Sequence, residues 1–257
     1  VTILHHLGIR VVLVHGGGPQ LDDVTAKLGV QTRMVQGRRV TDASAIDATS
    51  MVLNGLINTQ LVALCRSFGI SAIGIGGIDG GLVQAHRRAP VTLASGEVVD
   101  YGLVGDIDGI DGTVVTRLLD SGFLPVVSPL SCDNSGQLLN INADTVAAAI
   151  GGALVAEKLI LCTGAPGILE RVDDPQSLIS YTDLAGLRRL REKGAITDGM
   201  LPKSSAIETA IRGGVRRVHV ISYAETDSLL AEIFTNEGKG TLVVADTKAL
   251  TAAEQGQ

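Results

Sequence analysis

The sequence predicts an α/β protein whose mainly parallel sheet is covered by helices on both faces. Three observations support this prediction: short β-branched runs alternate with longer helical stretches, the runs are apolar throughout, and several end in glycine-rich turns. Strands buried on both faces carry continuous rather than alternating hydrophobic residues, and βαβ connections place helices over both faces. With 257 residues, of which 45% are hydrophobic, the chain can bury a sizeable core.

The first 150 residues predict a regular alternation of strands and helices. A buried strand at Arg10–His15 leads into a helix at Pro19–Leu28, where proline suits the first turn. Thr41 or Asp42 caps a long helical region that extends to about residue 68. The elements that follow are a strand at Ser71–Ile75, a hairpin excursion through Val83–Arg87, Val91–Leu93 and Glu97–Val99, a helix at Asp111–Asp120, a strand at Pro125–Ser128, and a helix that Asn142 or Asp144 opens and that runs to about Leu154.

The remaining residues predict a second set of strands and helices after a soft boundary near Gly151–Gly152, so we expect two lobes, 1–150 and 151–257. In parallel sheets with right-handed connections, the ligand crevice lies at the carboxyl ends of the strands. The predicted strands are Leu159–Thr163, Arg217–Ile221 and Thr241–Val244, and the predicted helices are Asp183–Lys193, Pro202–Arg212 and Ser228–Phe234.

The composition argues against several classes of partner. The net charge is −6, and the chain has three Tyr, three Phe and no Trp. Binders of single-stranded nucleic acid need a basic groove and aromatic stacking platforms, so no nucleic-acid partner is expected. Three scattered cysteines favour reduced thiols in a cytoplasmic protein, and apolar runs such as Leu159–Cys162 are too short to span a membrane.

Two glycine-rich turns follow predicted strands. The first, HGGGPQ at residues 15–20, precedes a predicted helix, and the second, GIGGIDGG at residues 74–81, leads into the hairpin. Glycine lets a backbone approach a ligand closely, and a helix N-terminus offers free N–H groups to an anion. Neither turn has the spacing of a Walker A or Rossmann loop. The sequence predicts a phosphate site here, with a tight turn that binds nothing as the alternative.

Three polar segments suit a small anionic substrate. Residues 37–42 (GRRVTD) place an arginine that can clamp a carboxylate, residues 140–144 (NINAD) place two amides on one side of an extended segment, and residues 197–203 (TDGMLPK) place a lysine at a helix start. A solvated arginine, simple helix capping and a solvated lysine are the respective alternatives.

Together, and in this order, these segments resemble the amino-acid kinase superfamily, and most closely the branch that phosphorylates the side-chain carboxylate of N-acetyl-L-glutamate in arginine biosynthesis. The resemblance implies a three-layer α/β/α sandwich with an open, mainly parallel central sheet. It also implies an acyl-amino-acid lobe at 1–150 that dimerises, an ATP lobe at 151–257, and ATP with Mg²⁺ as the phosphoryl donor. The segments that carry the resemblance are Val11–Gln20, Gly37–Asp42, Gly102–Asp106, Pro125–Ser128, Asn140–Asp144, Leu159–Leu169, Asp198–Lys203 and Glu232–Thr241.

The resemblance also implies roles for individual residues. Gly17 and Gly18 would donate backbone N–H groups to the substrate and the phosphoryl group, and Arg39 would grip the α-carboxylate. Asn140 and Asn142 would bind other polar groups of the substrate. The residues expected to be catalytic are Lys203, which would stabilise the phosphoryl group, and Asp144, which would orient the lysines; none is expected to ligate a metal directly. The ATP site would be lined by Thr163, Gly164, Ala165, Gly167, Ile168, Leu169, Ala195, Ile196 and Thr197.

Departures from the family pattern leave alternatives open. The family has a strand with a catalytic lysine that would precede Val1, so the chain is expected to be N-terminally incomplete. Gly164 stands where Asp is usual, and residues 74–77 lack a serine of the usual turn. The alternatives are a kinase of the aminoadipate route to lysine and a non-catalytic ligand-binding member of the fold. Glu232–Thr241 resembles a segment of arginine-inhibited hexamers, so a homodimer or a hexamer of dimers is expected, with arginine as a possible inhibitor.

Overall fold

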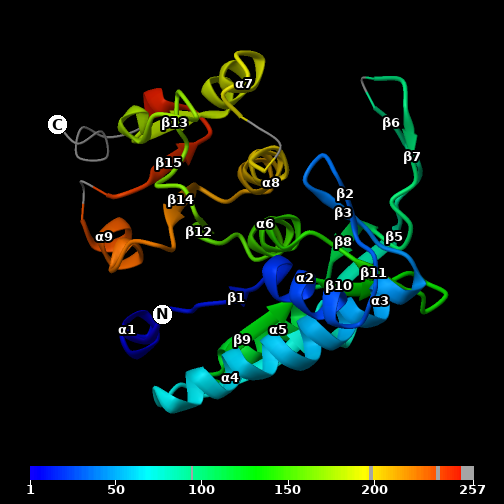
Figure 1. The fold of residues 1–257 in the computed structure, drawn as a ribbon. Helices are drawn as coiled ribbons and strands as arrows, with labels where there is room; N and C mark the ends of the chain where they lie inside the picture. Colours follow the sequence, from blue (N-terminus) through cyan, green and yellow to red (C-terminus); the bar gives the residue numbers. More distant parts are fainter. Residues whose placement is uncertain (94, 197–198, 236–237, 250–257) are drawn as a thin grey trace. The chain divides into compact units, whose positions relative to one another are not determined.

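The computed structural model describes residues 1–93, 95–196, 199–235 and 238–249. The chain divides into two compact units, Val1–Val146 and Ala147–Gln257, and the division falls within helix α6 (Ala143–Ala153) (Figure 1). Each unit has its own sheets. Paired strands that are joined through a helix are mainly parallel. The structure is therefore α/β with mainly parallel sheets.

A three-stranded parallel sheet forms the centre of the first unit. Its order is β1 (Leu13–Val14), β9 (Leu124–Ser128) and β4 (Ala72–Gly76), with β9 buried along its whole length between the other two. Val14 lies opposite Val127, and Gly76 lies opposite Ser128. The two glycine turns that follow β1 and β4 therefore leave the sheet at the same edge, the carboxyl edge, on either side of Ser128.

One long helix covers this sheet. It consists of α3 (Ala43–Ser50), a π-helical segment η1 (Met51–Ile57) and α4 (Asn58–Ser67), and it begins at Asp42, whose Oδ1 accepts a 2.8 Å hydrogen bond from the N–H of Ala45. Its inner side packs against α2 (Gly18–Lys27) and the sheet. Among the described residues, the stretch Ala43–Ser67 is long and apolar enough to cross a membrane by length and composition alone.

A second, mixed sheet and two hairpins complete the first unit. The strands follow the order β11 (Leu138–Asn140), β10 (Leu130–Cys132), β5 (Val83–Arg87), β8 (Gly105–Ile110). The hairpins pair β2 (Arg33–Val35) with β3 (Arg38–Val40), and β6 (Val91–Thr92) with β7 (Val98–Val99). They share an apolar cluster that includes Val35, Leu93 and Tyr101. Besides α2 and the long helix, this unit has the helices α1 (Thr2–His6) and α5 (Thr113–Asp120) among its described residues.

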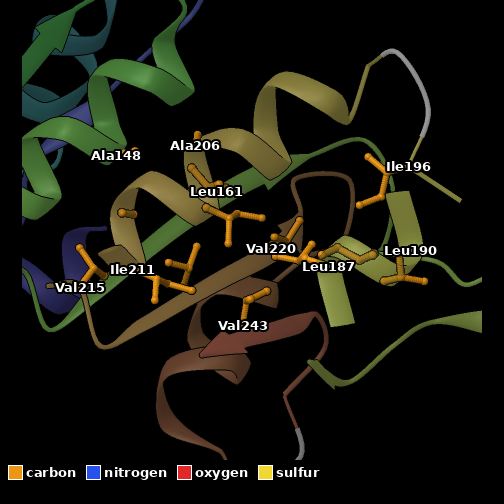
Figure 2. Packing of buried hydrophobic residues seen from close by; sticks show 14 residues of the cluster. Ala148, Leu161, Leu187, Leu190, Ile196, Ala206, Ile211, Val215, Val220 and Val243 are labelled. Carbon is orange, nitrogen blue, oxygen red and sulfur yellow. The ribbon is translucent and has the colours of Figure 1, made fainter. Parts of the chain in front are cut away.

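The second unit is a four-stranded sheet with helices on both faces. The order is β12 (Lys158–Thr163), β14 (Arg217–Ser222), β15 (Thr241–Val244), β13 (Tyr181–Asp183), and only the β14–β15 pair is antiparallel. On β14, Val218 and Val220 enter the core formed with α7 (Leu184–Glu192) and α8 (Leu201–Arg212) (Figure 2). His219, between them, contacts α9 (Ser228–Phe234) on the other face.

The predicted elements largely agree with this architecture. The bounds of β5, α9 and β15 are as predicted, and the long helix ends one residue earlier. The strand expected at Arg10–His15 is reduced to β1. The sequence analysis did not predict β8, β10, β11, β13 or the β2–β3 hairpin, and part of the GRRVTD segment forms β3.

Candidate active site

The first glycine turn presents open backbone donors at the start of a helix. Gly17 precedes α2, no side chain caps the helix, and Pro19 occupies its first turn. Within the described residues, the N–H groups of Gly17 and Gly18 have no hydrogen-bond acceptor. A Cβ atom at Gly17 would overlap Ile57 Cδ1 and lie 2.8 Å from Leu53 Cδ2, so the turn presses directly on the long helix. The turn therefore supplies unpaired N–H groups at the positive end of a helix dipole, which is an anion-binding arrangement.

The second glycine turn uses its donors internally. The N–H of Gly76 donates to Asp79 Oδ2 at 2.7 Å, and the N–H of Gly77 donates to the carbonyl oxygen of Ser128 at 3.0 Å. Both glycines are buried. The structure thus favours the alternative that this turn connects strand and hairpin, rather than the expectation of a second phosphate loop.

Arg39 is a buried guanidinium with one arm unpartnered. Its side chain is only 8% exposed, and its Nη2 donates to Asp22 Oδ1 on α2 at 2.6 Å. Its Nη1 is buried without a hydrogen-bond partner in the part of the chain that the structure describes. Since α2 begins at the first glycine turn, the Asp22 contact brings the predicted carboxylate clamp to that turn. A carboxylate ligand would satisfy the second arm with a charge-assisted hydrogen bond.

Asn140 is tied to the same group of residues. Its Nδ2 donates to Thr41 Oγ1 at 3.1 Å, and Thr41 Oγ1 donates to the Arg39 carbonyl oxygen at 3.3 Å. Asn140 ends β11, and Thr41, two residues after Arg39, is fully buried. Asn140 and Arg39 are therefore brought together by hydrogen bonds that the sequence alone does not reveal.

Asn142 caps the helix that Asn142 or Asp144 was expected to open. Its Oδ1 accepts from the N–H of Thr145 at 3.1 Å and from Thr145 Oγ1 at 3.3 Å, so its carbonyl oxygen caps α6. The expectation that Asn140 and Asn142 share one extended segment was wrong, because the strand ends at Asn140 and the helix begins at Ala143. Asp144 lies in the first turn of α6, and a Cβ added at Gly16 would be 3.6 Å from Ala143 Cβ. The start of α6 thus adjoins the first glycine turn.

Asp106, in the segment Gly102–Asp106, forms a structural ion pair. Both of its carboxylate oxygens accept from Arg88 Nε, at 3.0 and 3.1 Å. Burial alone would raise the pKa of Asp106, but the hydrogen bonds and charge of Arg88 outweigh burial and hold that pKa below its usual value. This pair joins β8 to the end of β5 and stabilises the hairpin region beside Arg38 and Arg39.

In the second unit, the predicted nucleotide loop begins where β12 ends. Thr163 pairs with Ser222, and its carbonyl oxygen accepts from the N–H of Tyr223 at 2.9 Å. A Cβ at Gly164 would lie 3.1 Å from the Tyr223 hydroxyl, so the tyrosine covers the position where the family pattern has Asp. Ala165 follows, half-buried, in this loop.

The rest of the predicted loop is anchored to the core. Gly167 lies against Leu178 and Thr241, and the N–H of Ile168 donates to Thr241 Oγ1 at 2.8 Å. Leu169 forms an isolated bridge with Leu178. Ile168 is 2% exposed and belongs to the core of this unit, so its side chain does not line a ligand site. Its backbone is also paired, since its carbonyl oxygen accepts a 2.9 Å hydrogen bond from the N–H of Ile179.

The second predicted nucleotide segment follows α7. The N–H of Ala195 donates to the Leu190 carbonyl oxygen at 3.0 Å, and Ile196 lies with Leu187 and Leu190 in the core (Figure 2). The Ile196 side chain is therefore buried against these leucines, and the nucleotide contact expected of this residue stays a prediction. Thr197 lies outside the described residues. Lys203 is in the first turn of α8 and is 8% exposed.

No group of three or more His, Cys, Asp or Glu side chains among the described residues is arranged to hold a metal ion.

Asp22 is a site residue that the sequence analysis missed, as are Asn54, Asn58 and Ser128 beneath the glycine turns. The sequence does not single these residues out, because their contacts form only when α2 and the long helix pack against the sheet.

Comparisons with known proteins agree with this arrangement. A sequence model of the amino acid kinase family matches residues 1–222. The chain is 44% identical over 261 residues to the acetylglutamate kinase of Myxococcus xanthus, covering 100% of this chain and 85% of that protein. It is 41% identical over 244 residues to the acetylglutamate kinase of Symbiobacterium thermophilum, covering 95% and 83%. Its fold is similar to the crystal structure of smu.665 from Streptococcus mutans, with a TM-score of 0.77, 26% identity, and coverage of 94% and 89%.

Proposed function

The chain belongs to the amino acid kinase family, and from this premise we propose that it transfers the γ-phosphoryl group of ATP to the side-chain carboxylate of N-acetyl-L-glutamate. The product is N-acetyl-L-glutamyl 5-phosphate, an intermediate of arginine biosynthesis, and the reaction takes place in the cytoplasm. The observation that carries the proposal is Arg39, a buried guanidinium with one unpartnered arm, held by Asp22 on the helix that starts at the open glycine turn. The identity to acetylglutamate kinases over nearly the whole chain supports the same substrate.

The chemistry requires alignment and positive charge rather than a base. A glutamate-like carboxylate has a pKa of about 4.3 and is already ionised at neutral pH. One of its oxygens bonds to the γ-phosphorus while the bond from that phosphorus to the β–γ bridging oxygen breaks, and the bond's electron pair leaves with ADP. The barrier comes from bringing one anion to another, so donors that face the transferred oxygens are the main catalytic device.

In the acyl-amino-acid unit, the N–H groups of Gly17 and Gly18 would bind the phosphoryl oxygens in transit. Arg39 would hold the α-carboxylate through Nη1, and its Nη2 would stay fixed by Asp22. Asn140 would bind a polar group of the substrate from its place beside Thr41. Asn142 retains its amide nitrogen for the substrate, since the α6 cap uses only its oxygen. Asp144, one residue beyond Ala143, would orient the cationic groups.

In the second unit, the loop from Thr163 to Leu169 and the residues Ala195–Thr197 would hold the nucleotide, mainly through backbone groups. Lys203, in the first turn of α8, would stabilise the transferred phosphoryl group. Mg²⁺ would arrive with ATP, because this ion keeps several waters and binds chiefly through substrate phosphates rather than a protein cage. The three-layer arrangement of the whole chain around one open sheet is part of this proposal, and the two-sided helix cover of the second unit's sheet supports it.

Self-association through the long helix fits its outer surface. Its exposed large apolar side chains are Met51, Leu56 and Leu64, and Phe68 follows directly after the helix. Exposed apolar patches of this kind mark interaction surfaces, so a homodimer through this helix is the assembly we propose, either alone or within a hexamer.

We also propose feedback inhibition by arginine, on the resemblance of Glu232–Thr241 to a segment of arginine-inhibited members. Glu232 is buried, its Oε1 is 2.7 Å from His219 Nδ1, and its Oε2 accepts from the N–H groups of Lys239 and Gly240. This carboxylate organises the segment that resembles arginine-inhibited members. Activity measured against increasing arginine tests the proposal, and an activity that does not change with arginine concentration rejects it.

The function is tested by trapping the acyl phosphate with hydroxylamine. The substrate panel contains N-acetyl-L-glutamate, the corresponding aminoadipate derivative and free glutamate. We expect turnover with N-acetyl-L-glutamate, and a rate lowered at least ~100-fold by Lys203→Ala. Turnover with the aminoadipate compound alone would transfer the assignment to lysine biosynthesis. ATP binding without turnover on any acid would identify a non-catalytic member.

A further inference from the structure

A buried polar pair lies directly beneath the open glycine turn. His15, at the end of β1, is 7% exposed, and Asn58, at the start of α4, is 6% exposed. The Nδ1 atom of His15 is 3.0 Å from the Gly16 carbonyl oxygen, and its Nε2 atom is 3.2 Å from Asn58 Nδ2. Both ring nitrogens therefore have partners, and neither is left to act on a substrate.

The partners of Asn58 determine where the imidazole proton resides. Asn58 Nδ2 donates to the carbonyl oxygen of Val126 at 2.9 Å, so the amide nitrogen, not the amide oxygen, faces His15. Nε2 must then accept a hydrogen bond from Asn58. The single proton of the neutral ring is on Nδ1, where it is donated to Gly16. Burial lowers the pKa of His15, which is consistent with a neutral ring.

The surrounding backbone is built to let Asn58 reach this position. A Cβ atom at Gly74 on β4 would overlap Asn58 Oδ1, so only glycine allows the amide to lie against the sheet. The π-helical segment η1 ends just before Asn58, and within it Asn54 accepts a hydrogen bond from Ser128 Oγ at the same edge. π-helical turns interrupt a regular helix and are frequent at functional sites. Two amides of one helix thus brace the carboxyl edge from which the glycine turns leave.

The hydrogen bond to Gly16 has a direct consequence for the next residue. A peptide unit is planar and trans, so the direction of the Gly16 carbonyl fixes the opposite direction for the N–H of Gly17. That N–H is one of the donors without an acceptor in the described chain. We propose that His15 is a positioning residue for phosphoryl transfer, which holds the Gly16–Gly17 peptide so that the Gly17 N–H stays directed at the anion. The proposal rests on the function proposed above.

Two substitutions of similar size and polarity separate the two hydrogen bonds. His15→Asn places an amide nitrogen near the Nδ1 position and can keep the donation to Gly16, but it loses the contact with Asn58. His15→Gln places its amide near the Nε2 position and can keep the contact with Asn58, but it loses the donation to Gly16. Both variants are measured for kcat, for the KM of each substrate and for thermal unfolding, beside the unaltered protein.

We expect His15→Asn to keep kcat within a few-fold of the unaltered protein. His15→Gln is expected to lower kcat by about 100-fold, the scale of a small misplacement at a reacting centre, with little change in KM. Equal losses of kcat in both variants, or no loss in His15→Gln when it remains folded, would overturn the proposal. If either variant fails to fold, the ¹⁵N chemical shifts of the imidazole in the unaltered protein decide: a proton on Nε2 rejects the inference.

NMR measurements also distinguish failure of the proposed function from failure of the inference about His15. If the unaltered protein phosphorylates none of the acids in the panel, the proposed function fails. A proton on Nδ1, together with a Gly17 amide resonance that responds to added inorganic phosphate in His15→Asn but not in His15→Gln, would still support the control of this peptide by His15. If the protein is active and the Gly17 amide responds to phosphate equally in both variants, the function stands and the inference fails.

Discussion

The two glycine turns of the first unit leave the same sheet edge but serve different purposes. After β1, the turn Gly16–Gly18 begins a helix and leaves its N–H groups without acceptors in the described chain. After β4, the N–H groups of Gly76 and Gly77 donate to Asp79 and to the carbonyl oxygen of Ser128. Glycine permits close approach in both, but in the first turn the approach leaves donors for a ligand, and in the second it completes the packing. Glycine content alone therefore does not identify a phosphate site.

The largest effect on activity is expected for Gly17→Ala, which alters the first turn. The new methyl group would overlap Ile57 and crowd Leu53, which shifts the open turn. We expect kcat to fall by about 100-fold or more, and the free energy of unfolding to fall by about 1–3 kcal/mol. Gly18→Ala is the control for stability, because a Cβ there meets no atom within 4 Å. Full activity in Gly17→Ala would show that the turn's geometry does not matter.

A second test concerns Arg39, which is hydrogen-bonded to Asp22 on the helix that begins at the first turn. Arg39→Lys keeps the charge but cannot donate to Asp22 and a carboxylate from one planar group. The KM for N-acetyl-L-glutamate should rise about 10- to 100-fold, as expected for loss of a charge-assisted hydrogen bond worth about 1.5–3 kcal/mol. Arg38→Lys is the matched control, since adjacent side chains on a strand point to opposite faces. Equal effects of the two substitutions would argue against a specific clamp.

The second turn is tested through Asp79. Asp79→Ala removes the acceptor of the Gly76 N–H and leaves a buried donor unpaired, so the free energy of unfolding should fall by about 1–2 kcal/mol. Activity of the folded protein should remain within a few-fold, because the N–H groups of this turn are already paired within the protein. Asp79→Asn, which keeps a carbonyl oxygen, should lose less stability. A loss of kcat as large as that expected for Gly17→Ala would indicate that the second turn also takes part in the active site.

The smallest expected effect is a pH dependence of stability that belongs to the first turn. The pKa of His15 is lowered from 6.5, chiefly by burial, so the folded state favours the neutral ring. Its contribution to stability is fully present above pH 6.5 and is lost as the pH falls below that value through the folded pKa. Urea unfolding measured between pH 5 and 8 should show this loss, and His15→Asn should show less of it. Identical pH profiles would remove His15 as the source.

Several elements were predictable because their signal is local. The strands β5 and β15 and the helix α9 were predicted with their bounds, since apolar and turn residues mark both of their ends. The strand β8 was not predicted, because its sequence GDIDGI has too few apolar residues and depends on pairing with β5. The sequence did not reveal that the side chains of Ile168 and Ile196 pack into the core, because the neighbouring elements that cover them are distant along the chain.

The sequence by itself determined the class of fold, the family, and the segments that carry the chemistry, since glycine spacing, the GRRVTD and NINAD segments and apolar runs are properties of neighbouring residues. Only the tertiary structure decided which glycine turn keeps its donors, that Asp22 holds one arm of Arg39, and that Asn58 and His15 lie beneath the turn. Hydrogen-bond partners are chosen between elements tens of residues apart, and the pairing of those elements depends on the packing of the long helix against the sheet. Motifs therefore predict where an anion would bind, and long-range contacts decide which groups remain free to bind it.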